Sequence, residues 1–107
     1  LSCPLSPREM LRLATADAAA ALGLAGAGSL APGSWGDVCV VGFGSPALAA
    51  TGDPEEAVAL GATPADVLLT AVAGHIVYRD GAWPDVDAGA ERQALERAAF
   101  RARAAAA

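Results

Sequence analysis

The fold is decided around residues 66–81, which read DVLLTAVAGHIVYRDG. Apolar and β-branched side chains fill most of this stretch, a composition typical of β-strands. We predict two consecutive strand segments, Asp66–Leu69 and Thr70–Tyr78. The Asp-Gly pair that follows is a strong turn signal, after which Ala82-Trp83 could return as a short partner strand.

A further strand is predicted upstream, where residues 38–43 read VCVVGF. Such an unbroken apolar run is typical of a strand that is covered on both faces. We therefore expect Cys39, which lies inside the run, to be a buried small side chain. Residues 44–65 have the composition of a loop, in which residues 54–58 could start a short helix.

A helix is predicted on the N-terminal side of these strands. Ser6 and Glu9 have the spacing of a capping box, and a proline between them suits the first helical position. Apolar residues then recur at helical spacing, and Gly23 can end the helix in the left-handed conformation. We predict a helix over residues 7–22, followed by a turn-rich segment in which Pro32-Gly33 suits a type II turn.

A second helix is predicted at the C-terminal end, over residues 88–105. Either Asp87 or Asp85 can cap it. The arginine-rich last turn complements the helix dipole. The element order is therefore helix, turn-rich segment, strand, loop, two or three strands, and helix. A sheet of about four strands is marginal alone, so we expect something outside this sequence to complete it.

Composition excludes several classes of protein. Of the 107 residues, 54% are hydrophobic and 18% are charged, which argues against a disordered polyelectrolyte. The net charge of −5 argues against nucleic-acid and anionic-membrane partners, because both require basic patches. No apolar run is long enough to span a membrane. The start lacks the pattern of a signal peptide and an initiator Met, so we expect a cytoplasmic protein of which this sequence is a piece.

Few side chains offer chemistry, and for each a structural role is the favoured interpretation. We expect His75 to be one side chain of a hairpin and Asp37 to accept backbone N–H bonds at the turn entering its strand. We expect Cys39 to be inert, and Cys3 has no neighbour that would activate it. We expect Trp35 and Trp83 to fill the core rather than a ligand pocket. A set of arginines is interpreted as a solvated helix face: Arg92, Arg97, Arg101 and Arg103.

Three ordered blocks resemble the amidohydrolase superfamily. Residues 5–24 resemble its "LSPxExLxxAT…A…ALGL" helix, and residues 28–41 resemble its "GSLxPGxxADxVVV" segment. Residues 66–81 are similar to its closing "DVxxVxVxGxxVxxDG" hairpin. Ala73 stands where that hairpin commonly carries an acidic residue or Asn. The pattern is most similar to the branch that includes cytosine-deaminase-like, guanine-deaminase-like and triazine-chlorohydrolase-like enzymes.

The resemblance implies an α/β fragment of a longer enzyme. Residues 1–24 would be a late helix of a (β/α)8 metal-dependent hydrolase barrel, residues 25–84 the strands of a composite β-domain, and residues 85–107 a C-terminal helix. The whole enzyme would hydrolyse a C–N bond of a heterocyclic or amidine-like substrate with a divalent metal, zinc or iron. Its metal ligands match no position here, so we expect no catalytic, cofactor-binding or metal residue in this chain.

The resemblance also implies partners: the remainder of the same polypeptide, a small-molecule substrate of the whole enzyme, and further copies in a homo-oligomer. We expect the isolated chain to self-associate, because its strand edges and helix face lack partners. An alternative hypothesis is a non-catalytic α/β interaction module that pairs through an exposed strand edge.

Overall fold

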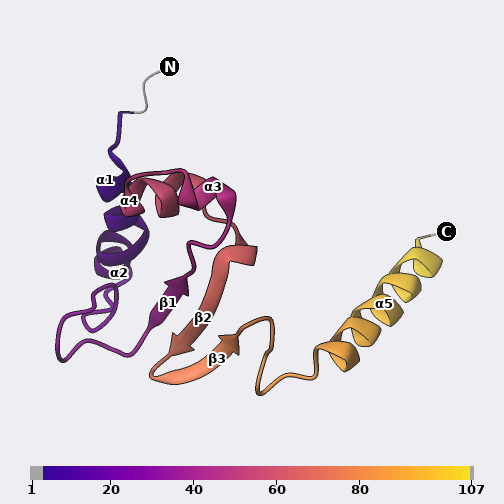
Figure 1. The fold of residues 1–107 in the computed structure, drawn as a ribbon. Coiled ribbons are helices and arrows are strands. Elements are labelled where there is room, and N and C mark those ends of the chain that lie inside the picture. Colours follow the sequence, from indigo (N-terminus) through magenta and orange to yellow (C-terminus); the bar gives the residue numbers. More distant parts are fainter. Residues whose placement is uncertain (1–3, 107) are drawn as a thin grey trace.

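The computed structural model describes residues 4–106, and its centre is a three-stranded antiparallel sheet (Figure 1). The strands are β1 (Val38–Val41), β2 (Val67–Val72) and β3 (His75–Arg79), in the order β1-β2-β3. Helical segments lie beside the sheet, and one long helix stands apart from it. The described residues thus form a small α/β arrangement.

The predicted N-terminal helix is confirmed. It consists of α1 (Pro7–Arg12), a wider π-helical turn η1 (Leu13–Asp17) and α2 (Ala18–Ala21), which follow one another without a break. The capping box is present, since the Glu9 carboxylate accepts a hydrogen bond from the Ser6 backbone N–H at 2.8 Å and the Glu9 N–H donates to Ser6 Oγ at 3.3 Å.

The helix ends where the glycine predicted it would. Gly23 has a φ of +71°, and the N–H of Leu24 donates to the carbonyl of Ala19 at 2.9 Å. Together with the bond from Gly23 N–H to the Ala20 carbonyl, this is a Schellman motif. The later Pro32-Gly33 turn is also confirmed, because Gly33 has a φ of +89° and its flanking residues are hydrogen-bonded.

The predicted boundary between strands at Leu69 and Thr70 is wrong. Strand β2 runs straight through it, because Thr70 pairs with Cys39 on one side and with Tyr78 on the other. The chain reverses instead at Ala73-Gly74, where φ is +50° and +80°. Two consecutive positive φ values define the type I′ turn that joins antiparallel strands most tightly.

The predicted Asp-Gly turn after β3 is confirmed. Asp80 and Gly81 both have positive φ, at +48° and +86°. Arg79 and Ala82 exchange backbone hydrogen bonds of 2.9 Å in both directions across it. The expected return strand is therefore a single bridge.

Residues 44–65 are more helical than predicted. The segment holds α3 (Pro46–Ala49), the expected helix α4 (Pro54–Glu56), and the turns η2 (Ala57–Gly61) and η3 (Pro64–Asp66). Proline opens α3, α4 and η3, at the position where its missing N–H costs nothing. The sequence places Pro46 and Pro64 in a loop, whereas both open helical segments.

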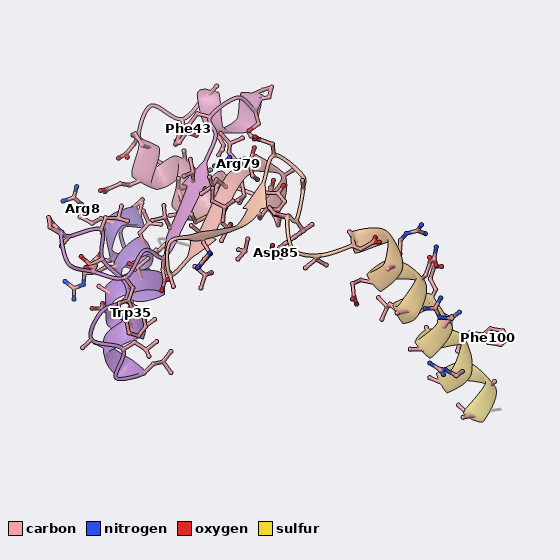
Figure 2. The ribbon with its side chains drawn as sticks, turned by 90° about the horizontal axis from the view of Figure 1, so that it is seen from below. Arg8, Trp35, Phe43, Arg79, Asp85 and Phe100 are labelled. Atoms are coloured by element: carbon pink, nitrogen blue, oxygen red, sulfur yellow. The ribbon has the colours of Figure 1, made fainter. Side chains whose placement is uncertain are left out.

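The C-terminal helix α5 spans Ala88–Ala105, as predicted. Asp87 is the cap, because its carboxylate accepts a hydrogen bond from the Ala90 N–H at 3.0 Å. Every residue described in α5 is exposed, and Figures 1 and 2 show the helix projecting away from the sheet beyond Asp85.

The buried apolar residues within 4–106 are Ala19, Leu48 and Ala57, so Leu48 is the one large side chain fully removed from solvent there. The chain exposes 7968 Å², whereas a compact protein of this mass exposes about 5,400 Å². Its radius of gyration is 18.1 Å, against about 13 Å for a compact domain. The prediction that residues 38–43 are covered on both faces is wrong, because β1 is an edge strand with Val40 42% exposed.

Candidate functional site

Asp37 fastens the β2–β3 turn to the start of β1. Its carboxylate accepts a hydrogen bond of 2.7 Å from the backbone N–H of Ala73, and the Gly36 carbonyl accepts one of 2.9 Å from Gly74. The expectation that Asp37 accepts a backbone N–H is confirmed, although the donor belongs to a turn 36 residues away rather than to its own. Asp37 therefore has a structural role.

A hollow of about 400 Å³ lies beside this contact, between η1, the 28–30 loop and β1. Its hydroxyl groups are engaged locally: Thr15 Oγ1 donates to the Leu11 carbonyl at 2.7 Å, and Ser29 Oγ accepts from the Ala31 N–H at 3.0 Å. Cys39 also lines it. The remaining lining is mainly apolar, which favours a docking surface over a reaction site.

The prediction that Cys39 is buried is wrong, because its side chain belongs to the uncovered edge strand β1 and is exposed. An apolar run predicts burial only where another layer covers the strand. Cys3, the second cysteine considered, lies outside the described residues.

His75 is the first residue of β3, pairs with Val72 and is exposed. Its interpretation as one hairpin side chain is confirmed. Within residues 4–106, no group of three or more His, Cys, Asp and Glu side chains lies close enough together to hold a metal ion. A divalent metal site therefore does not fit the part of the chain that the structure describes.

The two tryptophans were expected in the core, and this is wrong. Trp35 and Trp83 are 51% and 50% exposed. Trp35 covers Gly26, where any added side chain would collide with its ring, and Trp83 meets Tyr78 edge to face at a centroid distance of 5.0 Å. Each ring is thus packed on one side and half exposed, because no further layer covers it within residues 4–106.

The perturbed ionisable groups are structural. A hydrogen bond to Glu55 raises the pKa of Arg8, and the same contact joins α1 to α4 at 2.8 Å. The Ser6 hydroxyl lowers the pKa of Glu9, and the Thr63 backbone N–H lowers that of Asp66. These carboxylates cap helical turns, so their shifts indicate capping rather than acid–base chemistry.

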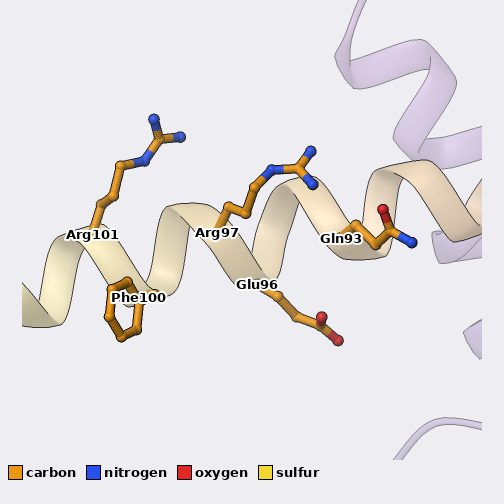
Figure 3. Close-up of a pocket in the computed structure, with 5 residues that line it drawn as sticks. All are labelled: Gln93, Glu96, Arg97, Phe100 and Arg101. Carbon is orange, nitrogen blue, oxygen red and sulfur yellow. The ribbon is translucent and has the colours of Figure 1, made fainter.

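Helix α5 presents a shallow hollow on its own surface, lined by Gln93, Glu96, Arg97, Phe100 and Arg101 (Figure 3). Arg97 and Arg101 extend from one side of the helix and Phe100 from another. Arg92 pairs with Glu96 at 3.0 Å. The four arginines are solvated, as predicted, because all of them are exposed. They do not share one face, however, since Arg92 and Arg103 stand on the opposite side of the helix from Arg97 and Arg101. Over residues 4–106, no helix combines the length and apolar character that crossing a bilayer requires.

The sequence is similar to that of an amidohydrolase-type deaminase. This relative is a 5-methylthioadenosine/S-adenosylhomocysteine deaminase of Nitratidesulfovibrio vulgaris (strain DSM 19637 / Miyazaki F), 38% identical over 80 residues. The match covers 75% of this chain and 18% of the relative. No family model matches the sequence. The likeness supports the broad amidohydrolase resemblance of the three sequence blocks and a hydrolase in general.

Proposed function

We propose that this chain is the C-terminal structural part of a metal-dependent amidohydrolase. The whole enzyme would be a deaminase that hydrolyses a C–N bond of a heterocyclic or amidine-like substrate. The observation that carries the proposal is the 38% identity to a deaminase over 80 residues. The order of the three amidohydrolase-like blocks supports it.

The large exposed surface of the chain favours a structural role within a larger protein. Its area exceeds that of a compact protein of the same mass by about 2,500 Å², which is the size of an obligate interface. In this proposal residues 1–24 belong to a (β/α)8 barrel, residues 25–84 to a composite β-domain, and residues 85–107 form a terminal helix. The remainder of the polypeptide would cover the open face of the first helix and the open edge at β1.

The catalytic residues and the ligands of the metal, zinc or iron, belong upstream of this chain in the proposal. The described residues offer no site that fits such a metal, so no catalytic step is assigned to them. We place the whole enzyme in the cytoplasm, as a homo-oligomer with a small-molecule substrate.

The test is to recover the reading frame upstream of Leu1 and express it together with this chain. We expect a His-x-His motif upstream and metal-dependent release of ammonia. Suitable probes are cytosine, guanine, 5-methylthioadenosine and S-adenosylhomocysteine. The 107-residue chain alone, assayed with the same metals, is the control and should be inactive. Ammonia release by that control would contradict the proposal.

A second candidate function is a non-catalytic module that pairs through a strand edge. It is favoured by the position of β1 at the edge of the sheet, where backbone groups can accept another strand. A start codon close to Leu1, with no His-x-His upstream, would support this alternative and contradict the first.

A further inference from the structure

Charge is divided unequally between α5 and the rest of the chain. Ten of the twelve acidic residues precede α5, whereas four of the seven arginines lie within it. Residues 1–87 therefore carry a net charge of −7, and α5 carries +2. A basic helix joined to an acidic body has an electrostatic reason to dock on such a body.

The α5 helix also carries an aromatic side chain that the described residues leave largely exposed. Phe100 is 75% exposed, and Arg97 and Arg101 line the same hollow on the helix surface (Figure 3). A large exposed aromatic flanked by arginines has the composition of an interface centre. Leu95 is similarly exposed, at 71%, but stands about 140° away around the helix and so belongs to another face.

Residues 1–87, the acidic body of the chain, have a hollow on the sheet that suits an aromatic side chain. Its volume is about 340 Å³ and its lining is mainly apolar, formed by Pro64, Val67, Thr70, Tyr78 and Trp83. Acidic residues adjoin this lining along the chain. Asp66 precedes Val67, Asp85 follows Trp83 by two residues, and the backbone N–H of Asp80 bonds to the Leu68 carbonyl at 2.9 Å.

The linker disfavours docking of α5 on its own sheet. The N–H of Val86 bonds to the Trp83 carbonyl at 3.2 Å, which keeps these two residues within about 7 Å of each other. Two more residues reach Ala88, so the helix starts within about 14 Å of Trp83. Phe100 lies about 18 Å further along the helix. The linker, at most about 14 Å long, is shorter than the roughly 18 Å of helix between Ala88 and Phe100. Phe100 therefore cannot readily fold back to reach Trp83 of its own chain.

We propose that α5 of one copy docks on the sheet of a second copy of this chain, with Phe100 in the Tyr78–Trp83 hollow and Arg97 and Arg101 against Asp80 and Asp85. Two such contacts related by a twofold axis give a reciprocal dimer. This inference does not rest on the proposed enzymatic role, because its observations are charge, exposure and linker length within this chain.

The test is analytical ultracentrifugation of the 107-residue chain over about 5 to 500 μM. We expect a dimer whose dissociation constant rises by about tenfold or more in Phe100→Asp, because a central aromatic anchor is lost. Leu95→Asp is the matched control, since it adds the same charge at an equally exposed site of the same helix, and it should change the constant by less than about twofold.

Charge and mixing experiments separate this dimer from other associations. Raising the salt from about 0.05 to about 0.5 M should weaken it, and Arg97→Glu with Arg101→Glu should weaken it further. A mixture of Phe100→Asp with Trp83→Asp should form heterodimers, because one intact contact remains between them. A wild-type chain that stays monomeric, equal effects of Phe100→Asp and Leu95→Asp, or no heterodimer would each overturn the proposal.

Discussion

The carboxylate of Asp37 holds the backbone N–H of Ala73 at 2.7 Å, and this contact ties the entry of β1 to the turn between β2 and β3. Ala73 has a φ of +50°, which an L-residue with a side chain adopts only at a cost. The neighbouring bond from Gly74 N–H to the Gly36 carbonyl fixes the same turn. A strained residue is thus held in place by a partner 36 positions earlier.

Removing the carboxylate should loosen β1. We expect Asp37→Ala to lower the free energy of unfolding by about 1–2 kcal/mol, because a hydrogen bond to a charged acceptor is lost. Urea unfolding of the 107-residue chain measures this. Glu56→Ala is the control, since it removes an exposed carboxylate without removing a side-chain hydrogen bond among the described contacts. Equal losses in the two variants would show that charge, not the bond to Ala73, matters.

Relieving the backbone strain should have the opposite effect. We expect Ala73→Asn to stabilise the chain by about 1 kcal/mol, because Asn tolerates the left-handed conformation and favours the first position of a type I′ turn. The paired variant Gly74→Ala places a side chain at a φ of +80° and should destabilise by about 1–2 kcal/mol. Thermal unfolding of both variants checks the prediction, which fails if the two changes have the same sign.

Close packing of the 28–30 loop on the first helix predicts a graded response to alanine. At Gly28 an added Cβ would lie 2.7 Å from the Thr15 carbonyl oxygen at a φ of +79°. Gly33 has a φ of +89° with open space around it. We expect Gly28→Ala to cost about 2–4 kcal/mol and Gly33→Ala about 1 kcal/mol, measured by urea unfolding. A larger loss in Gly33→Ala than in Gly28→Ala would contradict the interpretation that close packing makes Gly28 the more sensitive position.

Acid should destabilise the chain through its capping carboxylates. Folding lowers the pKa of Asp66 below its ordinary value of 3.8 and also lowers that of Glu9. Each group therefore stabilises the fold above its unfolded pKa, and this contribution is lost as the pH falls through the folded value. We expect the free energy of unfolding to fall below about pH 4, more steeply in the wild type than in Asp66→Asn. Urea unfolding from about pH 6 to about pH 2.5 measures the slope, and identical slopes would contradict the assignment.

Local signals in the sequence predicted the ends of the helices. The capping residues form hydrogen bonds with backbone groups only a few positions away, so the local sequence is enough to predict their roles. They are Ser6 with Glu9, Gly23 and Asp87. The type II turn at Pro32-Gly33 was predictable for the same reason. Composition and periodicity predicted no turn at Ala73, because alanine is an uncommon residue for positive φ, whereas the family resemblance implied a hairpin within residues 66–81.

Burial was the part that the sequence could not predict. Cys39 and both tryptophans have the composition of a core, yet whether they are buried depends on a layer that must come from elsewhere in space. The candidate site was limited in the same way. Its Asp37 contact joins residues 36 positions apart, and no local pattern specifies which distant N–H a carboxylate will meet.

The short turn at Ala73-Gly74 also sets an order of assembly. Strands β2 and β3 are joined by two residues, so their hairpin closes over a minimal loop and forms on the microsecond scale of such elements. Strand β1 must close a far longer loop before Asp37 reaches the turn. We therefore expect the β2–β3 hairpin to form first and β1 to pair with it last.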